Sequence, residues 1–133
     1  MNCIFCKIVS GEIPCAKVYE DEKILAFLDI KPVNLGHVLV IPKEHYANML
    51  ETPHDIIAGI FQKSKELMIS IKTAMSADFV VLSVVGIDVP HFHIHLLPRY
   101  SSDGLHNFWP TKEYKEGEMN DVAEKIRKVI SNQ

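Results

Sequence analysis

Pro90-His91-Phe92-His93-Ile94-His95-Leu96-Leu97-Pro98-Arg99 is the stretch of this 133-residue chain that decides its fold. Histidines alternate with apolar residues along it, and successive side chains of a strand point to opposite faces of a sheet. The alternation predicts a strand from Phe92 to Leu96, ended by Pro98, with its apolar side chains in the core. All three histidines then share the other face. A His-rich surface explains one isolated histidine, but three in strict alternation favour a functional site.

Metal binding and catalysis are both open to such a row of imidazoles. Ligands of one zinc ion place their nitrogens about 2 Å from it, whereas the backbones of His91 and His95 lie about 13 Å apart in a strand that rises about 3.3 Å per residue. One ion can therefore take two neighbouring histidines but not all three. At least one is left for other chemistry, and a neutral imidazole can act as a nucleophile or proton carrier.

The rest of the chain predicts further strands. Apolar, β-branched segments that read as strands are residues 17–19 and 24–28, joined as a hairpin, residues 38–41, stopped by Pro42, and residues 79–85, interrupted by Gly86.

Two helices are expected as well. Thr52 offers an N-cap hydroxyl and Pro53 a first-turn proline, and helical spacing of apolar residues continues to about Met75. A second helix is expected from about residue 120 to residue 130, after a loop in which Trp109 either packs on its own core, which is favoured, or reaches a neighbouring subunit. We therefore predict one α+β domain over residues 1–133, with an antiparallel five-stranded sheet, one long amphipathic helix and a C-terminal helix.

Composition narrows the classes of function. The chain is 47% hydrophobic and 23% charged, as expected of a globular domain, and no apolar run is long enough to cross a membrane. A net charge of -3 argues against binding a nucleic acid polymer, which needs clustered cations. The start of the chain lacks the pattern of a secretory signal, so we expect a cytoplasmic protein.

The three cysteines are Cys3, Cys6 and Cys15. An odd number without an export signal argues against a disulfide framework. Cys3-Ile4-Phe5-Cys6 fits two thiolates on one zinc ion, but a structural zinc site needs two more ligands. Cys15 is expected to be a small, buried or half-buried thiol.

Residues 91–97 resemble the His-x-His-x-His signature of the histidine-triad nucleotide-binding family. Similar segments are residues 3–14, 18–21, 26–30 and 36–45, so the resemblance covers essentially the whole chain. It implies a homodimer with a continuous sheet that binds a purine nucleotide and cleaves it at the α-phosphorus through a covalent nucleotidyl-histidine. Within the catalytic triad of His91, His93 and His95, the resemblance makes His93 the nucleophile and places His95 at the phosphate oxygens.

The resemblance also implies which residues bind the nucleotide. Asp29 sits where the family uses a carboxylate to accept hydrogen bonds from both ribose hydroxyls. His37 falls where the family has another histidine near the triad, and simple packing at the start of a strand is favoured over a role in orienting the triad. The apolar positions around the base correspond to Phe5, Ile8, Phe27, Leu28 and Ile30, each of which could equally be ordinary core.

Family members with the Cys-x-x-Cys form hold zinc, which implies His45 and His91 as the ligands that join Cys3 and Cys6. A shell of two cysteines and two histidines is closed, so one zinc ion per chain would be structural and would have no open position for catalysis.

One segment departs from the family pattern. Residues 83–90 are shorter than the usual loop before the triad and lack its Asn and Gln, and Asp88 brings a negative charge to a place that normally meets phosphate and leaving group. Three functions remain open. A nucleoside phosphoramidate hydrolase is favoured, a dinucleoside polyphosphate hydrolase is the alternative, and the third is a weakly active nucleotide-binding interaction protein.

Overall fold

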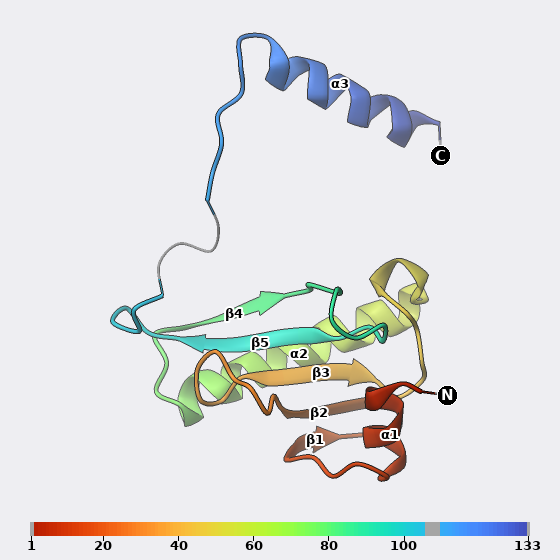
Figure 1. Ribbon diagram of the computed structural model, residues 1–133, viewed down its shortest axis with the longest axis vertical. Helices are drawn as coiled ribbons and strands as arrows, with labels where there is room; N and C mark the ends of the chain where they lie inside the picture. The colour runs from red at the N-terminus through yellow and green to blue at the C-terminus, as the bar shows by residue number, and fades with distance from the viewer. Residues whose placement is uncertain (1, 106–109, 133) are drawn as a thin grey trace. The chain divides into compact units, whose positions relative to one another are not determined.

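The computed structural model describes residues 2–105 and 110–132. They fall into two compact units, the first ending at Asp103 and the second starting at Gly104 (Figure 1). The predicted packing of Trp109 lies outside the described residues. No helix within those ranges has both the length and the apolarity to cross a membrane.

The first unit is built on one antiparallel sheet, in which the strands run in the order β1-β2-β3-β5-β4 (Figure 1). The strands are β1 (Lys17–Glu20), β2 (Ile24–Leu28), β3 (Val38–Pro42), β4 (Phe79–Ser83) and β5 (Ile94–Arg99). This architecture confirms the predicted α+β fold and its five strands. The homodimer stays a prediction.

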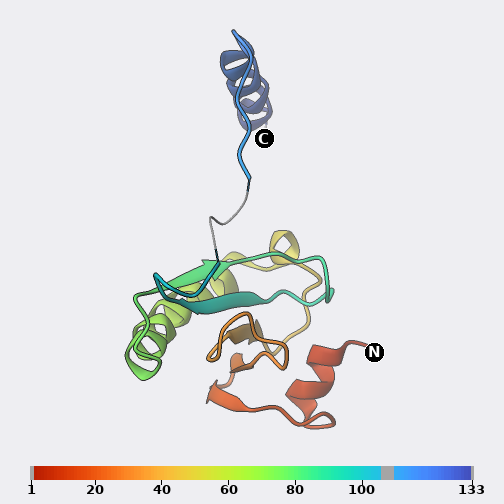
Figure 2. The ribbon, with the colours of Figure 1, turned by 60° about the vertical axis from the view of Figure 1, so that its left-hand side comes forward.

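Two helices lie on opposite faces of this sheet (Figure 2): α2 (His54–Ala74) on one and the short α1 (Ile4–Ser10) on the other. The helix α1 was not predicted from the sequence, because its seven residues are too few to show a helical period. Its start depends instead on a cap, in which the Cys3 sulfur accepts from the Cys6 N–H, and Gly11 ends it with φ +86°. The helix α3 (Glu118–Ser131) belongs to the second unit and confirms the predicted C-terminal helix.

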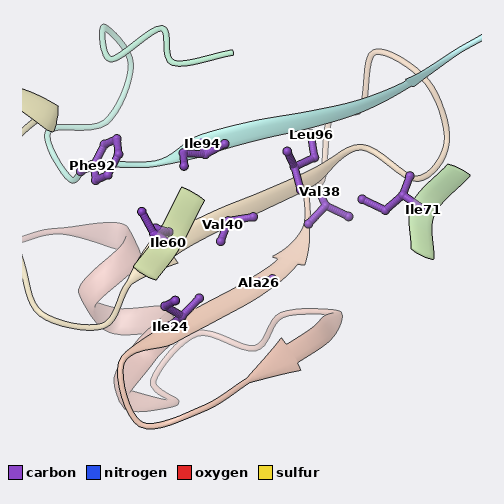
Figure 3. Close-up of a cluster of buried hydrophobic side chains, with 9 residues drawn as sticks. All are labelled: Ile24, Ala26, Val38, Val40, Ile60, Ile71, Phe92, Ile94 and Leu96. Atoms are coloured by element: carbon purple, nitrogen blue, oxygen red, sulfur yellow. The ribbon is translucent and has the colours of Figure 1, made fainter. Parts of the chain in front are cut away.

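The main core lies between α2 and the sheet. Figure 3 shows Ile60 and Ile71 of α2 facing apolar side chains from β2, β3 and β5. The buried members of this cluster are Ile24, Ala26, Val38, Val40, Ile60, Ile71, Phe92, Ile94 and Leu96. It contains Phe92, Ile94 and Leu96, which confirms the predicted alternation and leaves the histidines on the α1 face.

A smaller apolar cluster covers the α1 face. Phe27 of β2 pairs with Leu39 of β3, and Leu39 pairs with His95 of β5, so these three side chains form one row across the sheet. Phe5 of α1 packs edge-on against Phe27, with ring centroids 5.7 Å apart. The three histidines therefore lie on a face with an apolar surface formed by the sheet and bounded on one side by α1.

Two local predictions were wrong. Thr52 does not cap α2. Its hydroxyl instead donates to the Asn48 carbonyl (2.8 Å) in the short 3-10 turn Met49–Glu51, and Pro53 stands at the N-cap position. Pro98 does not end β5, which continues to Arg99. Pairing with β3 stops at Leu96, and the Pro98 carbonyl on that side accepts from the Asn34 side chain, so the missing N–H of Pro98 breaks no ladder bond.

Candidate nucleotide and metal site

The three histidines of the motif lie close together beside α1. His91 and His93 come just before β5 and are 0% and 4% exposed, and His95 lies within the strand. The Phe5 ring contacts His91 and His93 edge-on, at centroid distances of 5.8 Å and 5.1 Å. The His93 and His95 rings are 5.0 Å apart. Phe5 thus packs against two of the three imidazoles, which limits how they can turn.

Backbone carbonyls fix the protonation of the first two histidines, because a carbonyl oxygen can only accept a hydrogen bond. His91 Nε2 lies 2.8 Å from the Pro42 oxygen and must carry a proton, which leaves a lone pair on Nδ1. His93 Nδ1 lies 2.7 Å from the His91 oxygen and is the protonated nitrogen of that ring. The lone pair of neutral His93 is therefore on Nε2.

A second chain of hydrogen bonds assigns His95. The Val33 N–H donates to His37 Nδ1 (3.2 Å), so the proton of neutral His37 is on Nε2. That nitrogen lies 3.0 Å from His95 Nδ1 and donates to it, which places the His95 proton on Nε2. His95 Nε2 is buried and has no hydrogen-bond partner among the described residues. It is a donor for which the described protein offers no acceptor.

Burial favours the neutral forms of His37, His91 and His95. It lowers the pKa values of His37 and His91 below that of a free imidazole. It also lowers the pKa of His95, and the neighbouring His93 and His37 lower it further. The carboxylate of Asp29, 3.7 Å from His37 Nε2, opposes the effect of burial on His37. The hydrogen bonds of His37, His91 and His95 are thus those that their neutral forms make.

Four predicted metal ligands converge at the end of the row. Cys3 Sγ lies 3.4 Å from His91 Nδ1, and Cys6 Sγ lies 3.3 Å from His45 Nδ1. The two Nδ1 atoms are 3.2 Å apart, and all four donor atoms lie within 4.8 Å of one another. The His91 proton is on the far nitrogen, bound to a carbonyl, so Nδ1 is free to coordinate. Two sulfurs and two imidazoles form the donor set that suits zinc.

Asp29, His37 and His95 also bring donor atoms within 4.8 Å of one another, but they fit a metal poorly. Coordination through His37 Nε2 requires the proton of that ring on Nδ1, where it would oppose the incoming N–H of Val33. The backbone thus keeps the proton between His37 and His95. The two clusters differ in chemistry although both are rich in histidine.

A cavity of about 260 Å³ opens between α1 and the sheet. The predicted residues on its wall are Phe5, Ile8, Phe27, Leu28, Asp29, Ile30, Asp88, His93 and His95. His37 and His91 are not on the wall. His37 makes its hydrogen bond to His95 from behind it, and His91 belongs to the Cys/His cluster, which consists of Cys3, Cys6, His45 and His91. His37 therefore does more than pack at the start of a strand, because it also donates a hydrogen bond to His95 of the triad.

Six further residues lie on the cavity wall and were not predicted from the sequence. They are Ile4, Ile13, Pro14, Cys15, Leu39 and Val89. The spacing of Ile4 and Ile8, one helical turn apart, was the available signal for the α1 side of the cavity. Cys15 is half-buried, as predicted, and its thiol is free.

Residues 10–102 match the HIT domain family. The chain belongs to the HIT, or histidine triad, family. An adenosine 5'-monophosphoramidase of Schizosaccharomyces pombe is 38% identical over 135 residues, covering 98% of this chain and 99% of that protein. The crystal structure of a protein from Streptococcus mutans UA159 matches with a TM-score of 0.89 at 40% identity, covering 98% of this chain and 87% of that one.

A second solved HIT structure bears on the Cys/His cluster. The Zn-bound histidine triad family protein from Mycobacterium smegmatis matches with a TM-score of 0.76 at 31% identity, covering 100% of this chain and 99% of that one. The family thus has a zinc-bound member of nearly the same length, and this HIT chain has a donor set suited to zinc.

Proposed function

We propose that this protein hydrolyses nucleoside 5'-phosphoramidates, with His93 as the nucleophile. The observation that carries the proposal is the bond from His93 Nδ1–H to the His91 carbonyl, because it leaves the Nε2 lone pair in a cavity that also contains Asp29. An imidazole lone pair held in place is a competent nucleophile at neutral pH. The similarity to a phosphoramidase over nearly the whole chain supports the choice of substrate.

In this proposal the nucleotide lies along the cavity. The apolar wall made by Phe5, Ile8, Phe27, Leu28 and Ile30 takes the base. Asp29 Oδ1 already accepts from the Lys31 N–H (2.9 Å), and the carboxylate keeps further lone pairs for the ribose hydroxyls. His95 Nε2–H, which lacks a partner among the described residues, donates to an α-phosphate oxygen.

The reaction then takes two steps. His93 Nε2 forms a bond to the α-phosphorus while the bond from phosphorus to the leaving nitrogen breaks, and the leaving amine keeps the electron pair and takes a proton from solvent. Water next attacks the phosphorus and releases a proton to solvent, the bond from phosphorus to Nε2 breaks, and its electron pair returns to the imidazole. His37 holds the His95 proton on the nitrogen that faces the phosphate. Splitting one displacement into two lets each proceed in line.

Cys3, Cys6, His45 and His91 would hold the zinc ion. A closed shell of four protein ligands gives the ion a structural role, in which it fixes the geometry of the site. The His91 ring would be one ligand, and the His91 carbonyl accepts the hydrogen bond from His93 Nδ1–H. His91 thus links the metal site to the nucleophile His93.

Mass spectrometry of the intact protein tests the proposed nucleophile. After brief mixing with adenosine 5'-phosphoramidate, we expect an adduct of one adenylyl group on the wild type and none on His93→Gly or His93→Ala. Turnover in both variants should fall by at least about 1,000-fold, as expected when a covalent nucleophile is removed.

The control variant is Cys15→Ser, which changes the cavity wall and leaves the histidines intact, and it should still form the adduct. Turnover of His93→Gly at the wild-type rate would refute the mechanism. Nucleotide binding without turnover by any form would support the interaction-protein alternative.

A further inference from the structure

Asp88 places a negative charge on the wall of the cavity. It is exposed on the wall that also contains His93 and His95, in the segment between β4 and β5. No hydrogen bond or ion pair holds its carboxylate within residues 2–105 and 110–132. The other carboxylate of the cavity, Asp29, is different, because it accepts the Lys31 N–H and lies near His37.

The residues on the cavity wall include no lysine or arginine to offset the charge of Asp88. The negative charge of Asp88 acts on His95 of the triad. Burial lowers the pKa of His95, and Asp88 is one of the two carboxylates that act in the opposite direction. An anion bound against His93 and His95 therefore meets a negative charge on the same wall.

We propose that Asp88 selects the leaving group of the substrate: its carboxylate favours nucleotides whose group beyond the α-phosphate is cationic or neutral, such as an amine, and disfavours anionic groups such as sulfate or a polyphosphate. This inference rests on the proposed function, because the selected group is the one that leaves when His93 attacks. Asp88 acts through its charge alone, and no proton transfer is assigned to it.

The size of the effect follows from the exposure of Asp88. A partly solvated pair of unit charges a few ångströms apart changes an equilibrium or rate by about tenfold, and salt screens it. In the proposed arrangement the base and ribose contact residues other than Asp88, whereas the α-phosphate binds at His95, on which the charge of Asp88 acts. Removing the charge should therefore change the discrimination between leaving groups, and a ratio between two substrates with the same α-phosphate reports that change separately from any gain in phosphate affinity.

Two substrates with the same reacting bond but oppositely charged leaving groups test the effect of Asp88. Adenosine 5'-phosphoramidates of ethylenediamine and of glycine have the same phosphorus–nitrogen bond, but one carries an ammonium group and the other a carboxylate. We expect wild-type kcat/KM to be about tenfold higher for the cationic compound at low salt. Asp88→Asn should bring the ratio close to one, Asp88→Lys should invert it, and added salt should narrow it only in forms that carry a charge at position 88.

Glu22→Gln is the matched control, since it removes one negative charge at an exposed residue that is not on the cavity wall and should keep the wild-type ratio. An unchanged ratio in Asp88→Asn would overturn the inference. Calorimetric dissociation constants of the same two compounds separate it from the proposed function. If the wild type turns over neither compound, the proposed function fails. An affinity ratio that still depends on residue 88 would then support the charge selection, and one that does not would refute it.

Discussion

Ser64 is a polar residue in the apolar core. It lies on α2, is 0% exposed, and its hydroxyl has no hydrogen-bond partner among the described residues. A buried hydroxyl without a partner costs about 1–3 kcal/mol. We therefore predict that Ser64→Ala raises the free energy of unfolding by about 1 kcal/mol, measured by urea denaturation.

Ser70 provides the matched control on the same helix. It is exposed, and its hydroxyl donates to the Glu66 carbonyl (3.4 Å). Alanine improves helix propensity at both positions, so only the difference between the two substitutions reports the buried hydroxyl. Equal gains at positions 64 and 70 would contradict the prediction.

At the scale of elements, a buried ion pair holds the end of β5. Arg99 Nε donates to Asp103 Oδ2 (2.7 Å), and the same oxygen accepts the Tyr100 N–H (3.0 Å). Both charged side chains are less than one tenth exposed. Removing one charge of such a pair leaves the other buried and uncompensated, so Asp103→Asn should lower the free energy of unfolding by about 3 kcal/mol.

The exposed pair of Glu124 and Arg127 on α3 is the comparison. Water screens that pair, so Glu124→Gln should leave the unfolding curve nearly unchanged. A small effect of Asp103→Asn, similar to that of Glu124→Gln, would show that the buried pair does not stabilise the turn after β5.

At the scale of the whole molecule, the Cys/His cluster joins parts of the chain that are far apart in sequence. Cys3 and Cys6 lie at the start of the chain, His45 follows β3, and His91 precedes β5. A metal that links them stabilises the folded state over the unfolded chain. We predict one zinc per chain by elemental analysis, and a melting temperature that falls when a chelator removes the metal.

Cys6→Ser should lose the zinc, whereas Cys15→Ser should keep it, because the Cys15 thiol is not part of the cluster. A chelator should therefore lower the melting temperature of Cys15→Ser as it does that of the wild type. A wild-type protein that contains no zinc after expression in zinc-rich medium, and that does not bind added zinc, would contradict the prediction.

The sequence by itself determined the features that depend on local patterns. The alternation of residues 91–96 placed Phe92, Ile94 and Leu96 in the core, because side chains in an extended chain have a period of two. The five strands and α2 followed from similar patterns, with ends displaced by at most three residues. The wrong predictions at Thr52 and Pro98 arose because each residue is held by a contact outside its own pattern.

Only the tertiary structure decided how the site is connected. The protons of His91 and His95 are fixed by Pro42, Val33 and His37, none of which belongs to the motif, whereas that of His93 is fixed by the His91 carbonyl within it. The cavity wall needs α1, which is too short for a sequence pattern, and the cluster joins Cys3 to His91 across 88 positions. A hydrogen bond or a metal ligand depends on distances between atoms brought together by folding, whereas strand and helix patterns depend on neighbours along the chain.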